Sequence, residues 1–304
     1  YHLLKKNNYN ALLGGNIGTP ILSLNIKKDS VLVIEASSFQ LSHSKFINPD
    51  YAFLLNITND HLDWHGNMRK YINAKFKIFE GQKKNQFSLC NKKFKSFYIK
   101  KNLSGKLIVP ELKSYLKLKP HIENSYITSD INDENMSYVF ELSKLFKISK
   151  KSFINSLKNF SGLEHRYEIF LKKNSCIFIN DSKATSFQST KFALKNSTNI
   201  FWIVGGKPKK NDKIILKHLK KNIVKSYIIG KDINFFQKQL KHQINYEVVK
   251  SLKNSIKKIL KDVKFYKKKN NTVLLSPASA SFDQFRDFEE RGKRFKQLCK
   301  YYAK

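Results

Sequence analysis

The amino-acid sequence predicts an α/β protein with two domains, each built around a mostly parallel sheet. Short runs of β-branched and aromatic residues alternate with longer segments of helical periodicity, which is typical of strands joined by crossover helices. This alternation breaks at Gly162 and Leu163 and then begins again. A length of 304 residues also leaves room for two domains at about 100–200 residues each.

The first domain is expected to cover residues 1–162. Its two buried strands should end in polar residues, at the edge where parallel sheets place their active sites. The elements predicted here are strands at residues 31–35, 51–57, 87–90 and 97–99, and helices at 67–79, 135–146 and 151–160.

The second domain is expected to cover residues 163–304, with helical segments between its strands. Stretches rich in Lys and Asn, such as residues 83–85, 92–95 and 264–271, are predicted to be solvated loops. The strands predicted for this domain lie at residues 176–179, 200–204, 226–229, 246–249 and 272–275.

The net charge of +35 suggests a nucleic-acid partner, but the composition argues against one. Only five of the 58 basic residues are Arg, whose guanidinium group forms paired hydrogen bonds to phosphate and to guanine. Lys, Asn, Ile and Phe have codons rich in A and T, so their excess fits a drift of the gene toward those bases. The three widely spaced cysteines predict no disulfide framework, and no apolar run approaches the roughly 20 residues of a membrane span. We therefore expect a soluble protein of a reducing cytoplasm.

Two polar segments of the first half are candidates for a site. The glycine-rich residues 14–18 surround Asn16, so they form either a close approach to a ligand or a plain turn. Glu35 ends an apolar strand, where a carboxylate can bind Mg²⁺. Ser37 or Ser38 could equally cap a helix there.

A third segment gathers acids and imidazoles just beyond the strand at residues 51–57. It contains Asp60, His61, Asp63 and His65, and Lys75 follows on a predicted helix. Such groups usually stay solvated unless they are paired. The cluster therefore indicates a metal or phosphate site, with a surface network as the alternative.

The second half contains several polar strand ends that indicate a nucleotide site. Arg166 can fork onto a phosphate, Asp181 can accept ribose hydroxyls, and residues 182–185 can offer N–H groups to an anion. Residues 205–210 and 276–283 follow two further strands. In a doubly wound sheet all three ends would face a common crevice, whereas ordinary helix capping is the plainer interpretation.

Seven collinear motifs now resemble the Mur ligase family. They are GGNIGTP at 14–20, VIEASSFQL at 33–41, the segment 56–79, GLEHRYE at 162–168, NDSKATS at 180–186, VGGKPKKND at 204–212 and the segment 274–295. SSFQL and SPASASFDQF are similar to the members that add D-glutamate. The resemblance covers nearly the whole chain.

The resemblance implies a central ATPase domain at residues 1–162 and a C-terminal Rossmann-like domain at 163–304 that binds amino acid and nucleotide. The family also has an N-terminal domain for the UDP-sugar and a phosphate-binding loop upstream of residue 14. No Gly-x-x-x-x-Gly-Lys-Ser/Thr string occurs in the 304 residues. The chain is therefore expected to be an incomplete, inactive fragment of an ATP-dependent ligase in peptidoglycan precursor synthesis.

The implied reaction joins D-glutamate to UDP-N-acetylmuramoyl-L-alanine through an acyl phosphate. By resemblance, Glu35 binds one Mg²⁺, and His61 binds a second beside Lys75, which carries a CO₂-derived carbamate. Asn16 contacts the UDP-sugar. We expect a monomer that binds neither nucleic acid nor membrane.

The implied nucleotide contacts are Asn135, Arg166 and Asp181. Tyr138 replaces the family's second Asn near adenine, so it could stack on the base or fill the core. A sibling ligase of the folylpolyglutamate type and a non-catalytic polyanion-binding module remain alternatives. The residues implied around D-glutamate are Lys183, Thr185, Lys209, Ser281 and Phe288.

Overall fold

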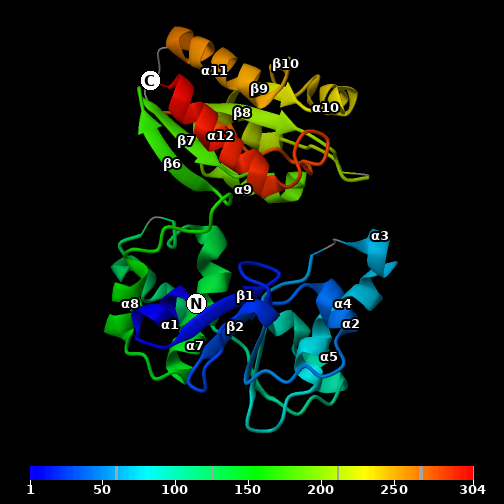
Figure 1. Cartoon of the computed structure of the whole chain (residues 1–304), viewed down its shortest axis with the longest axis vertical. Helices are drawn as coiled ribbons and strands as arrows, with labels where there is room; N and C mark the ends of the chain where they lie inside the picture. Colours follow the sequence, from blue (N-terminus) through cyan, green and yellow to red (C-terminus); the bar gives the residue numbers. More distant parts are fainter. Residues whose placement is uncertain (59–60, 125, 211, 267–269, 304) are drawn as a thin grey trace. The chain divides into compact units, whose positions relative to one another are not determined.

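The computed structural model describes residues 1–58, 61–124, 126–210, 212–266 and 270–303. The chain divides into two compact units, Tyr1–Phe160 and Ser161–Lys304 (Figure 1). Each unit contains its own sheets and apolar clusters. In the described part of the chain, no helix combines the length and the apolar character needed to cross a membrane.

The first unit contains two separate parallel sheets. One is two-stranded and pairs β1 with β2, so that Gly15 lies opposite Glu35. The other is three-stranded in the order β3-β4-β5. The strands are β1 (Ala11–Gly15), β2 (Val31–Glu35), β3 (Tyr51–Leu54), β4 (Phe87–Cys90) and β5 (Lys106–Ile108).

Helices bury two apolar clusters in this unit. One cluster packs Phe76 and Phe79 of α4 against Leu54 of β3, and the other contains Phe140 and Phe153 of α7 and α8. The helices are α1 (His2–Lys6), α2 (Ser38–His43), α3 (Leu62–His65), α4 (Met68–Glu80), α5 (Lys95–Lys100), α6 (Leu112–Leu116), α7 (Asp133–Leu145) and α8 (Lys150–Leu157).

The strand predicted at residues 97–99 is wrong, because these residues lie in helix α5. Phe94 and Phe97 both pack against Phe76, with ring centroids 6.0 and 4.5 Å away. A spacing of three residues places both rings on one face of a helical turn. A run of three apolar residues was too short to separate strand from helix.

The second unit is built on one six-stranded sheet in the order β10-β9-β8-β11-β7-β6. Every described pair is parallel except β6–β7, and the strand β6 was not predicted. The strands are β6 (Glu168–Lys173), β7 (Cys176–Asn180), β8 (Ile200–Gly205), β9 (Ile223–Ile229), β10 (Tyr246–Lys250) and β11 (Asn271–Leu275).

Both faces of this sheet are covered by helices (Figure 1). Phe201 and Trp202 are successive residues of β8 and belong to two different apolar clusters, as the alternation of side chains along a strand requires. Phe295 of α12 packs on the first cluster and Phe236 of α10 on the second. The helices are α9 (Phe187–Lys195), α10 (Ile233–Leu240), α11 (Leu252–Tyr266) and α12 (Phe288–Tyr302).

Candidate functional site

In the first unit, Asn16 and Glu35 meet at the carboxyl end of the β1–β2 pair. The Asn16 side chain donates from Nδ2 to Oε1 of Glu35 over 3.1 Å, and its backbone N donates to the Glu35 carbonyl over 2.8 Å. Gly15 has φ +107°, and a Cβ there would lie 2.4 Å from that carbonyl. Only glycine fits this turn, which leaves both polar side chains exposed.

The segment after Glu35 caps a helix, as the alternative interpretation expected. Ser37 accepts from the backbone N of Gln40 and forms a capping box with that residue. The buried Ser38 lies 2.9 Å from Nε2 of His65. This contact joins α2 to α3 and places the end of β2 next to the histidine cluster.

His61 and His65 belong to a cluster of rings around Phe39. The Phe39 ring centroid is 4.9 Å from that of His61 and 5.7 Å from that of His65. His61 has φ 55° and precedes α3. Tyr71 of α4 completes the cluster, with its ring 6.2 Å from His61 and 5.0 Å from His65.

Lys75 lies one helical turn after Tyr71, and its Nζ is 5.3 Å from the centre of the Tyr71 ring. Burial lowers the pKa of His65, and the positive charges of His61 and Lys75 lower it further. The structure therefore brings His61 and Lys75 to the same ring. Sequence reasoning missed Tyr71, although its spacing of four residues from Lys75 on a helix could have indicated it.

These residues fit Mg²⁺ only in part. Glu35 offers an exposed carboxylate, which is the ligand type that Mg²⁺ prefers. The ammonium of Lys75 would repel a cation unless its amine were converted to an anionic group. Asp60 lies outside the described residues, among which no group of three or more His, Cys, Asp or Glu could hold a metal.

In the second unit, three polar strand ends meet as expected, because β11 lies between β7 and β8. Ser276, which follows β11, donates through Oγ to Oδ2 of Asp181, which follows β7, over 2.6 Å. Lys207, which follows β8, exchanges backbone hydrogen bonds of 2.9 Å with Ala280. The three ends are thus hydrogen-bonded to one another.

Asp181 is more buried than a ribose contact would suggest. It is 5% exposed, and its Oδ1 accepts from the backbone N of Tyr167 over 3.0 Å. Burial raises the pKa of Asp181 to about 7, although the hydrogen bonds from Ser276 and Tyr167 and the charge of Arg166 oppose this rise. Both carboxylate oxygens are therefore already used within the protein.

The other expected nucleotide and amino-acid contacts lie around these strand ends. Lys183 has its Nζ 5.4 Å from the centre of the Phe288 ring, and its backbone N donates to the His165 carbonyl over 2.9 Å. Arg166 and Lys209 are exposed, Thr185 and Phe288 are half-buried, and Ser281 is buried.

In the first unit, Asn135 is exposed on α7, and Tyr138 of the same helix is part of the core. Tyr138 is 2% exposed and donates through Oη to the Leu54 carbonyl over 3.0 Å. Of the two interpretations of this replacement, core filling is confirmed, since a buried ring cannot stack on a base. The side chain of Asn91 donates to Glu134 beside Asn135.

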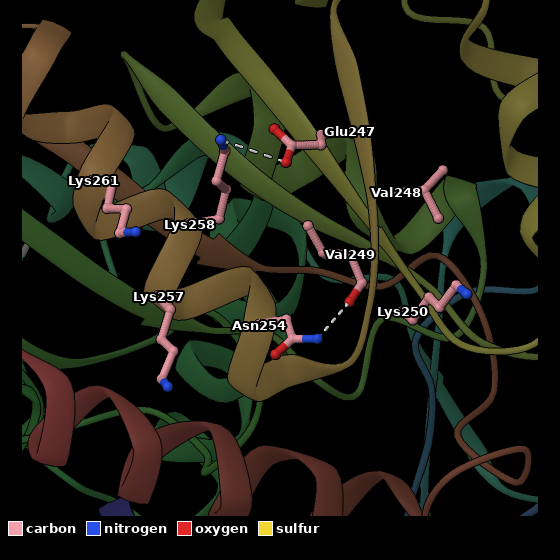
Figure 2. Close-up of a pocket in the computed structure, with 8 residues that line it drawn as sticks. All are labelled: Glu247, Val248, Val249, Lys250, Asn254, Lys257, Lys258 and Lys261. Carbon is pink, nitrogen blue, oxygen red and sulfur yellow. Dashed lines mark hydrogen bonds and ion pairs between the residues drawn. The ribbon is translucent and has the colours of Figure 1, made fainter.

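A lysine-lined pocket of about 400 Å³ lies between β10 and α11, and the sequence did not indicate it (Figure 2). Lys258 pairs with Glu247 across it at 3.6 Å, and Asn254 donates to the Val249 carbonyl over 3.2 Å. Its other lining residues are Val248, Lys250, Lys257 and Lys261. Its one acidic residue, Glu247, also pairs with Lys225 at 2.6 Å, and its other charged residues are lysines. None of these residues is at the ends of β7, β8 or β11.

The chain is similar to curated proteins over nearly its whole length. It is 31% identical to the UDP-N-acetylmuramoylalanine–D-glutamate ligase of Wolbachia sp. subsp. Brugia malayi, covering 100% of this chain and 72% of that protein. It is 36% identical to the ligase of the same name from Buchnera aphidicola subsp. Schizaphis graminum, covering 98% and 71%.

Solved structures of Mur ligases share the fold. The MurF ligase from Thermotoga maritima in complex with ADP superposes with a TM-score of 0.66 at 16% identity, over 100% of this chain and 77% of that one. A MurF from Acinetobacter baumannii gives 0.70 at 12% identity, over 98% and 73%. The family model of the Mur ligase middle domain matches residues 4–159. The chain therefore belongs to the Mur ligase family.

Proposed function

We propose that this chain belongs to an ATP-dependent amide ligase that adds D-glutamate to UDP-N-acetylmuramoyl-L-alanine in peptidoglycan precursor synthesis. The observation that carries the proposal is the 31–36% identity to ligases of that name across nearly all of the chain. The polar strand ends of both units supply side chains suited to phosphates and carboxylates.

The reaction runs in two steps. The γ-phosphoryl group of ATP passes to the carboxylate of the L-alanyl substrate, which gives an acyl phosphate and ADP. The amine of D-glutamate then attacks the acyl carbon, and the tetrahedral intermediate collapses to amide and phosphate. Catalysis of this kind depends on positioning and on neutralising the charge that develops on the phosphoryl oxygens.

Residues of the first unit are assigned to the phosphoryl step. Glu35 would hold Mg²⁺ at the end of β2, and Asn16, which is hydrogen-bonded to Glu35, would contact the UDP-sugar. His61 would hold a second Mg²⁺ together with a carbamate on Lys75. Bound Mg²⁺ neutralises phosphate charge. A carbamate on Lys75 would supply the anionic ligand that a second Mg²⁺ beside His61 needs and that a free ammonium cannot provide.

Residues of the second unit are assigned to the nucleotide and the amino acid. Arg166 and Asp181 are assigned to the nucleotide. In the first unit, Asn135 is separately assigned a nucleotide contact. Lys183 and Lys209 pair with the two carboxylates of D-glutamate. Thr185, Ser281 and Phe288 border the same substrate. We further propose a monomer in the cytoplasm.

The proposal is tested with the chain extended upstream by the family's N-terminal UDP-sugar domain and phosphate-binding loop (the extended chain). Incorporation of labelled D-glutamate into UDP-N-acetylmuramoyl-L-alanine should exceed that of L-glutamate, D-alanine and L-lysine. Equal use of L-lysine, or γ-linked addition of glutamate, would move the protein to a sibling ligase. Nucleotide binding that falls steeply with salt would instead favour a polyanion-binding module, for which the lysine-lined pocket is the candidate site.

A further inference from the structure

Arg291 is a buried cation for which the structure shows no carboxylate partner among the described residues. It lies in the first turn of α12 and is 1% exposed. Burial lowers its pKa to about 9, and the charge of Asp283 only partly offsets this. Its Nη1 has no hydrogen-bond partner in the described part of the molecule. Burying an unpaired charge is costly, so packing alone does not account for an Arg here.

The guanidinium holds together the polar ends of β7 and β11. Its Nε donates to Ser182 Oγ over 3.0 Å, and its Nη2 donates to the carbonyls of Ser182 and Ser279 over 2.8 and 3.0 Å. Gly206, after β8, borders the same group, since a Cβ there would lie 3.3 Å from Nη1. The rigid fork of an Arg can reach these acceptors together, whereas a single ammonium cannot keep all three.

Ser182 connects the Arg291 guanidinium to two residues that are assigned to the amino-acid substrate. Its Oγ donates to the Phe288 carbonyl over 2.8 Å, and the next residue along the chain is Lys183. The Lys183 side chain lies over the Phe288 ring, and its backbone is tied to His165. Because Nη1 itself is enclosed, Arg291 reaches the site only through these neighbours.

We propose that Arg291 is a positioning residue that fixes Lys183 and Phe288 for the incoming amino acid, acting through Ser182 and Ser279 and not by contact with substrate. This inference rests on the proposed ligase function. Its effect should fall on the amino acid, because two of the three acceptors belong to Ser182, which precedes Lys183 and donates to the Phe288 carbonyl. It should spare the nucleotide, because Asp181 is held separately by Tyr167 and Ser276.

The kinetic test uses the extended chain, with the family's N-terminal domain and phosphate-binding loop. Arg291→Met should raise the KM for D-glutamate about tenfold or more, with the KM for ATP changed less than about twofold. Arg291→Lys should fall between Met and wild type. Ser182→Ala, which keeps the guanidinium but breaks the link to Phe288, should shift the same KM in the same direction. Arg294→Met is the matched control, because Arg294 is exposed on the same helix.

A second readout uses the 304-residue chain itself. The backbone amide of Lys183 should exchange with deuterium about tenfold faster in Arg291→Met than in Arg294→Met. If Arg291→Met does not fold, Arg291→Lys and Ser182→Ala decide the question. Kinetics and exchange equal to those of the control would overturn the positioning role alone. Failure of the wild type and the control to incorporate D-glutamate would overturn the proposed function and this inference with it.

Discussion

The two units differ in how their sheets hold the polar strand ends. In the second unit all residues of β8 and β11 are buried, and their ends are hydrogen-bonded to each other and to β7. In the first unit, β2 leaves Leu32 36% and Ile34 43% exposed, and no described strand pairs with its second edge. Asn16 and Glu35 therefore lie on the less supported sheet. The difference indicates that the proposed amino-acid site is preorganised, whereas the proposed metal site is the more easily disturbed.

The largest expected effect is on local stability. Amides of β8 and β11 should exchange with deuterium at least about 10⁴-fold more slowly than those of β1 and β2, because an isolated two-stranded sheet is marginal in water. Hydrogen exchange followed by mass spectrometry of the 304-residue chain measures this ratio. Similar protection of the two pairs would remove the contrast between the units.

The second effect concerns chemistry in the first unit. In the extended chain, Lys75→Ala should lower turnover about 10³-fold or more, since it removes the anionic ligand that a second Mg²⁺ would need. Short carboxylic acids should restore part of the activity by occupying the vacated volume. Lys70→Ala, exposed on the same helix, is the control. Full activity of Lys75→Ala without added acid would exclude the carbamate.

The third effect comes from the buried carboxyl group of the second unit. The folded pKa of Asp181 is raised from 3.8 to about 7, so its contribution to stability is present below pH 3.8 and is lost as the pH rises toward 7. In Asp181→Asn, Oδ1 can still accept from Tyr167 N, and Nδ2 can donate to Ser276. Between pH 4 and 8 the wild type should therefore lose about 3 kcal/mol relative to Asp181→Asn.

Denaturant unfolding at several pH values, followed by the fluorescence of the buried Trp202, tests this prediction. Asn196→Asp is a useful control, because it places a carboxyl group at the end of α9 without burying it at the strand ends. Parallel pH profiles of wild type and Asp181→Asn would mean that Asp181 ionises normally.

The sequence predicted the elements that carry a strong local pattern. The strands β4, β7 and β8 were placed to within a residue, because apolar β-branched or aromatic runs fill strands that are mostly buried. The antiparallel edge strand β6 was missed, because its apolar run has only three residues and lies between charged ones. The short helix α5 was mistaken for a strand because packing on Phe76, which lies far away in sequence, decides its form.

The sequence predicted those residues of the candidate site that are charged or polar and follow the end of a predicted strand. Sequence motifs indicated Glu35, His61 and Lys75, and the structure brings His61 and Lys75 to the Tyr71 ring. The sequence did not predict that Arg291 is buried, because an Arg among Glu and Lys at the start of a helix is typical of an exposed position. Burial depends on the fold of three distant segments, which no local pattern encodes.

The smallest expected effect is on the affinity for the amino acid in the second unit. Lys209 is exposed beyond β8, so the solvent-screened pair that it would form with a carboxylate is worth at most about 1 kcal/mol. In the extended chain, Lys209→Ala should therefore raise the KM for D-glutamate about fivefold and leave that for ATP within twofold. Lys210→Ala, its exposed neighbour, should change neither constant. Equal effects of the two substitutions would mean that general positive charge, and not a specific pair, attracts the substrate. Such a result would also weaken the contrast between the two units, since a preorganised amino-acid site requires one lysine to contribute more to binding than its neighbour.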